Sequence, residues 1–74
     1  MAMTAHAIKQ ILQSHPLEDN LIQFKAVNFE FFFNEQCELQ EENNIIVVRH
    51  GIYLDYVDIN SIALVAVTPS KEEQ

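Results

Sequence analysis

Hydrophobic and polar positions repeat with a helical period at the start of the chain and with a period of two afterwards. Ala5 and Ile8 begin an apolar stripe at three- and four-residue spacing, and Thr4 is placed to cap the free amides of the first turn. Pro16 ends the helix, because it lacks an amide hydrogen and pushes the preceding residue out of the helical region. The pattern predicts a helix over residues 4–14, which must dock on another element because a lone helix of this length is marginal in water.

Residues 21–67 alternate apolar with polar side chains in short runs, a pattern typical of antiparallel strands. Phe29, Phe31 and Phe33 fall on one face of such a strand, which predicts that they lie in the core. Phe32 falls on the opposite, polar face. Either the helix or a second layer covers Phe32, or it faces a partner subunit.

The second half of the chain contains a strand that is apolar on both faces, two turns and a final strand without charged residues. Residues 45–48 are apolar without alternation, so we expect cover on both faces. Gly51 is expected to take a positive φ angle, and Asp58 or Asn60 to cap a short turn. The final strand, residues 62–67, has no charge that would protect an open edge from pairing with another chain.

The order of these elements predicts an α+β fold in a single small domain, residues 1–74. An N-terminal α-helix is followed by a strongly bent antiparallel sheet of four to five strands, or by a small barrel made from that sheet. Residues 68–74 are predicted to form a charged tail.

The stretch "YVDINSIALVAVTP", residues 56–69, resembles the end of a subunit in the Sm-like, Hfq-type family of small β-barrels. As an order of elements, the resemblance extends over residues 5–69. It implies an Sm-like barrel, and rings in which the last strand of one subunit pairs with a strand of the next. Val57 and Asp58 stand where the family carries its RNA-binding Lys-His pair, and a hydrophobe and an acid cannot hold a phosphate. The resemblance therefore implies a barrel without the family's RNA-binding activity.

Charge and composition narrow the choice of partner. Eleven acidic and four basic residues give a net charge of −7, which repels phosphates and anionic lipids. We therefore expect neither a nucleic-acid nor a membrane partner, and the simplest interpretation of the charge is solubility. The single cysteine, Cys37, excludes an internal disulfide and fits a reducing compartment. The chain has no run of about 18 apolar residues and no signal-peptide pattern, so we expect a cytoplasmic protein.

Candidate chemistry is sparse. Cys37 and His50 would need the fold to bring them together as a nucleophile and base, and no catalytic motif accompanies them. Cys37 shares the phenylalanine face, where a lone thiol behaves as a small hydrophobe. His50, Asp55 and Asp58 lack the close second His or Cys of a zinc site. The sequence predicts no enzyme, no cofactor and no bound metal.

These observations favour a non-catalytic, acidic interaction or assembly module that acts through protein–protein contacts. We expect it to bind a protein partner or itself, as a homo-oligomer. The alternative is an acidic inhibitor or regulator, a nucleic-acid mimic, that occupies a basic site on a target protein. The apolar side chains predicted to form the interface are Phe32, Ile62, Leu64, Val65 and Val67.

Overall fold

The fold is known from a computed structural model, which describes residues 3–70. One α-helix precedes six strands and two short 3₁₀ helices, labelled η. In chain order the elements are α1 (Ala5–Ser14), β1 (Asn20–Ala26), β2 (Glu30–Phe33), β3 (Cys37–Gln40), η1 (Glu41–Asn43), β4 (Ile45–His50), β5 (Tyr53–Asp58), η2 (Ile59–Ser61) and β6 (Ile62–Pro69).

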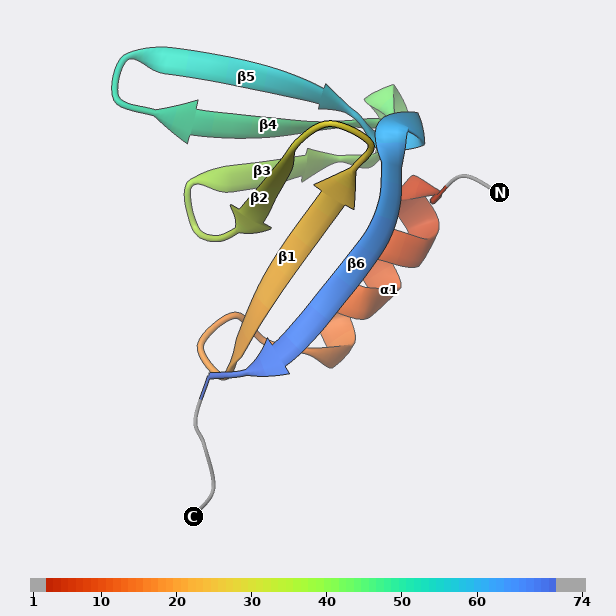
Figure 1. The fold of residues 1–74 in the computed structure, drawn as a ribbon, viewed down its shortest axis with the longest axis vertical. Helices are drawn as coiled ribbons and strands as arrows, with labels where there is room; N and C mark the ends of the chain where they lie inside the picture. The colour runs from red at the N-terminus through yellow and green to blue at the C-terminus, as the bar shows by residue number, and fades with distance from the viewer. Residues whose placement is uncertain (1–2, 71–74) are drawn as a thin grey trace.

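The six strands form two three-stranded antiparallel sheets, with strand orders β2-β1-β6 and β3-β4-β5 (Figure 1). The α+β class is therefore confirmed, but the prediction of one sheet of four to five strands, or of a closed barrel, is wrong. The alternation of apolar and polar residues continues from Phe29 to Leu39, but the structure has β2, a turn and β3 there. In that turn Asn34 Oδ1 accepts a hydrogen bond from the Gln36 amide at 2.8 Å, and the Asn34 carbonyl accepts one from the Cys37 amide at 2.9 Å.

Helix α1 begins and ends where its capping residues predict. Thr4 has extended backbone angles and accepts a hydrogen bond from the Ala7 amide on its hydroxyl, at 3.1 Å. At the other end the His15 amide donates to the Ile11 carbonyl at 3.0 Å, and Pro16 follows. Ala5 and Ile8 are buried, so the apolar stripe of the helix packs into the core.

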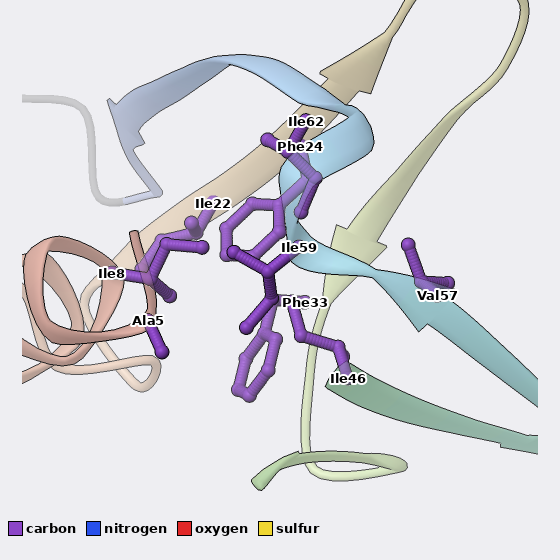
Figure 2. Close-up of a cluster of buried hydrophobic side chains, with 9 residues drawn as sticks. All are labelled: Ala5, Ile8, Ile22, Phe24, Phe33, Ile46, Val57, Ile59 and Ile62. Carbon is purple, nitrogen blue, oxygen red and sulfur yellow. The ribbon is translucent and has the colours of Figure 1, made fainter. Parts of the chain in front are cut away.

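The core lies between the two sheets and α1, and all of these elements contribute to it. Figure 2 shows Ala5 and Ile8 of the helix on the side of Ile22 and Ile59. Phe24 is fully buried, and its ring lies against those of two β2 residues. The buried cluster consists of Ala5, Ile8, Ile22, Phe24, Phe33, Ile46, Val57, Ile59 and Ile62.

The prediction that Phe29 lies in the core is wrong, although Phe31 and Phe33 do face the core as the alternation predicts. Phe33 is buried and Phe31 packs against the core, but the Phe29 side chain is 44% exposed. Phe29 lies just before β2, where a cleft of about 350 Å³ opens between β2 and the β4–β5 hairpin; Val57 also lines it. The two sheets do not close over this end, so Phe29 reaches only the margin of the core.

The β4–β5 hairpin follows the predicted pattern close to the core and departs from it further out. Ile46 and Val47 are consecutive in β4, so their side chains point to opposite faces of the strand, and both are buried. The expected cover on both faces is therefore confirmed. Gly51 has φ +63°, and its place at the start of a two-residue connection is that of a type II′ hairpin turn. At the far end of β5, the Asp58 carboxylate caps η2 by accepting from the Asn60 amide at 3.0 Å.

The end of the chain differs from the predicted tail. Thr68 and Pro69 belong to β6, where they lie across from Leu21 and Asn20 of β1. The Ser70 amide donates to the Asp19 carbonyl at 2.9 Å, which ties the end of β6 to the loop before β1. The rest of the predicted tail, residues 71–74, lies outside the described residues.

Candidate interaction surfaces

The predicted interface residues divide between the surface and the core. Phe32 lies across from Gln23 of β1, and Leu64 lies across from Lys25, so both occupy the outer face of the β2-β1-β6 sheet. Their side chains are 50% and 48% exposed, respectively. Helix α1 packs on the opposite, inner side with Ile8 and does not cover Phe32.

The other predicted interface residues face inward. Ile62 is 1% exposed and belongs to the buried cluster. Val65 and Val67 lie across from the buried residues Phe24 and Ile22, and both pack against the core. Their side chains therefore hold β6 on the core, and what β6 offers outward in this region is its backbone edge.

Four strand edges have no partner strand within residues 3–70, those of β2 and β6 in one sheet and those of β3 and β5 in the other. β6 pairs with β1 on one side, and β5 pairs with β4 on one side, while the second side of each strand has no partner strand. β6 carries no charged side chain, whereas β5 carries Asp55 and Asp58. Figure 1 shows the edges of β5 and β6 on different sides of the molecule, because the two strands belong to different sheets. Unpaired N–H and C=O groups on such edges form a template for another chain.

The exposed apolar side chains of the β4–β5 hairpin are absent from the predicted interface. Ile52 in the turn is 90% exposed, and on β5 Tyr53 and Tyr56 are each 64% exposed and Leu54 43%. The hairpin projects past the neighbouring strands (Figure 1), and both faces of β5 reach solvent until Val57. Alternation along a strand does not reveal this, because it does not indicate how far the strand extends past the elements that cover it.

A second surface feature surrounds Phe32. The open groove beside it has a volume of about 370 Å³. Its apolar wall contains Leu17, from the loop after α1, and Leu21, from β1; these side chains are 38% and 51% exposed. Its charged residues are both acidic, Glu18 and Glu35.

The structure does not bring the residues considered for catalysis into a reactive arrangement. The Cys37 thiol contacts the Phe32 carbonyl at 3.6 Å and Asn34 Oδ1 at 3.8 Å. His50 Nε2 lies 2.6 Å from Asp55 Oδ2 instead, on the exposed part of the hairpin. Among residues 3–70, no three His, Cys, Asp or Glu side chains gather where they could hold a metal ion.

Comparisons with protein-family models, with curated proteins and with solved structures give no match to this chain. The resemblance to Sm-like barrels stays a prediction. No helix within residues 3–70 has the length and apolar character needed to span a membrane.

Proposed function

We propose that this protein is a non-catalytic interaction and assembly module that acts through protein–protein contacts and self-association. The observation that carries the proposal is that two of the four open edges, those of β5 and β6, are each accompanied by exposed apolar side chains. Soluble proteins usually protect an edge with lysine, proline or a bulge. β6 has no charged residue, its bulge at Ala63 lies near the start of the strand, and its proline, Pro69, is the last residue.

Pairing of β5 from one copy with β6 from the next would use both edges in one head-to-tail contact. Each new backbone hydrogen bond would contribute about 0.5–1.5 kcal/mol net. Leu54 and Leu64 are 43% and 48% exposed, so burial of the part that is still exposed would add about 1 kcal/mol for each side chain. A contact of this kind closes into a ring if the rotation between copies permits, and otherwise it continues as a filament. The Sm-like resemblance supports the ring.

The mass of the purified protein in solution tests this proposal. Light scattering is expected to give a multiple of the 8.5 kDa chain mass. Leu64→Glu and Leu54→Glu are each expected to raise the dissociation constant at least about tenfold, because a charge would enter the buried contact. Each new carboxylate faces a basic cross-strand neighbour, Lys25 or Arg49, so the fold itself should tolerate it.

The matched control is Val27→Glu, which makes the same change at a loop residue that is 94% exposed. This variant should keep the wild-type mass. A monomeric wild-type mass at high micromolar concentration would refute self-association. So would a dissociation constant that is unchanged in both edge variants.

The acidic surface supports the second candidate function, an acidic regulator that occupies a basic site on a target. Every Asp and Glu within residues 3–70 is exposed. A contact made by these charges should weaken steeply as salt rises, whereas a contact through apolar strand edges should not. The salt dependence of target binding therefore separates the two functions. A cytoplasmic location is part of the proposal and is supported by the free thiol of Cys37.

A further inference from the structure

The groove beside Phe32 exists because β1 is longer than its partner β2. The β1–β2 pairing ends where Ile22 lies across from Phe33, and the chain then turns away toward β3. β1 extends further, through Asn20 and Leu21, and these two residues pair only with β6. The side of β1 that β2 leaves unpaired forms one border of the groove.

Five of the nine residues that line this groove are apolar. Ile22 and Phe33 line it and are 0% and 8% exposed, so they belong to the core. The groove is also lined by Leu17, Leu21 and Phe32, which are large apolar side chains left partly in solvent. Exposed hydrophobes scattered singly need no explanation, but three around one hollow indicate a contact site.

The groove also has a definite charge. Its charged residues, Glu18 and Glu35, are exposed, and no basic residue lines it. Neither carboxylate forms an ion pair within residues 3–70. Two uncompensated negative charges beside an apolar floor complement an apolar side chain that is flanked by positive charges, and they disfavour an acidic partner.

We propose that this groove binds an extended segment of a partner protein in which one or two large apolar residues are flanked by Lys or Arg. The inference rests on the proposed function, because it assumes that the chain works through protein contacts. The apolar residues would occupy the hollow as anchors, and the flanking cations would reach Glu18 and Glu35 at the rim. The unpaired side of β1 at Asn20 and Leu21 favours an extended backbone alongside it.

A second copy of this chain fits the groove less well. The chain carries a net charge of −7, and its four basic residues, Lys9, Lys25, Arg49 and Lys71, are far apart in the sequence. The chain therefore has no apolar residue with a Lys or Arg close to it on both sides, as pairing with Glu18 and Glu35 at the rim would require. Charge complementarity points to a different, basic partner.

The test uses the Leu64→Glu variant as background, so that self-association and groove binding are measured separately. The probe is the peptide acetyl-Lys-Lys-Leu-Phe-Lys-Lys-amide, titrated into the isotope-labelled protein and followed by NMR. Shifts are expected at the amides of residues 17–22 and 32–35. One control peptide replaces the central Leu-Phe pair by Ser-Ser, and a second replaces the lysines by glutamates.

Phe32→Ala is expected to weaken peptide binding at least about tenfold, because it removes the largest exposed apolar contact in the groove. Phe32 is half-exposed, so the variant should stay folded, and circular dichroism checks this. Glu18→Gln combined with Glu35→Gln should weaken binding about two- to tenfold and reduce its salt dependence. Glu38→Gln with Glu42→Gln removes the same charge elsewhere and should leave the affinity unchanged.

Equal binding of the Ser-Ser peptide would overturn the proposal, since the contact would then be unspecific attraction to an acidic surface. Wild-type affinity in Phe32→Ala would overturn it too. A third outcome is that Phe32→Ala abolishes self-association while the protein that retains Phe32 does not bind the peptide. The groove would then be assigned to a second copy of this chain. That result would refute this inference and leave the proposed function standing. If the wild-type chain, with Leu64 in place, is monomeric and still binds the peptide specifically, self-association is refuted and this inference stands.

Discussion

Substitution of Phe24 measures how much of the stability of the fold depends on one ring. Phe24 is fully buried, and its ring centroid lies 5.4 Å from that of Phe31 and 5.6 Å from that of Phe33. Truncation of a buried Phe to Ala costs about 3–5 kcal/mol, from lost burial and from the cavity left behind. A domain of this length is stable by about 4–11 kcal/mol in total. Phe24→Ala is therefore expected to remove about a quarter or more of the free energy of unfolding, or to prevent folding.

Two further variants keep the measurement interpretable. Phe24→Leu stays apolar and should cost less than about 1.5 kcal/mol, which corresponds to a melting temperature lower by roughly 5–10 °C. Phe29→Ala removes the same ring at a position that is 44% exposed, so about 1 kcal/mol is expected from its partial burial. The free energies come from urea unfolding at a protein concentration low enough to keep the chain monomeric. Equal costs for Phe24→Ala and Phe29→Ala would refute the described core.

Two local predictions concern backbone positions. Thr4→Ala should lower the free energy of unfolding by about 1 kcal/mol, because the Ala7 amide loses its capping acceptor, while Thr4→Ser should keep most of the stability. Gly51→Ala should cost about 1–2 kcal/mol, because a side chain at φ +63° is strained even though nothing lies within 4 Å of the new Cβ. Gly51→Asn should cost less than Gly51→Ala in the same urea experiment, since Asn tolerates this conformation better; equal costs would show that the turn does not impose the positive φ.

Local chemistry made several elements predictable from the sequence. The helix was predictable because Thr4 and Pro16 act on the chain beside them, whatever the rest of the fold does. The short turn capped by Asp58 and the positive φ of Gly51 were predictable for the same reason. Each of these features depends only on residues that lie within a few positions of one another in the sequence.

The interface residues on β6 were harder to predict, because a bulge shifts the pattern. Ile62 lies across from Ala26, but Leu64 lies across from the preceding residue, Lys25, so Ala63 is an extra residue in β6. Ile62 and Leu64 have the same parity in the sequence, yet Ile62 is buried and Leu64 is exposed. A bulge depends on the partner strand, so period-two alternation within β6 does not contain it.

The groove and the open edges depend on contacts between distant segments. The groove at Phe32 requires Leu17 and Glu35, which come from two separate loops. The sequence marked Phe32 as an apolar residue on a polar face, but it gave no sign of which residues would surround it. The lengths of β1 and β2, and where the chain turns between β2 and β3, decide that outcome.

The pairing of β1 with β6 also dictates an order of folding. β1 is the central strand of its sheet, yet its partner along most of its length is the last strand of the chain, residues 62–69. The β1–β2 and β4–β5 hairpins need only neighbouring residues and can form early, whereas β6 must close a loop of more than thirty residues. During synthesis, β1 therefore lacks its second partner until residue 69 has left the ribosome. Until then the nascent chain exposes Phe24 and Ile22 to whatever chaperone or neighbouring chain it meets.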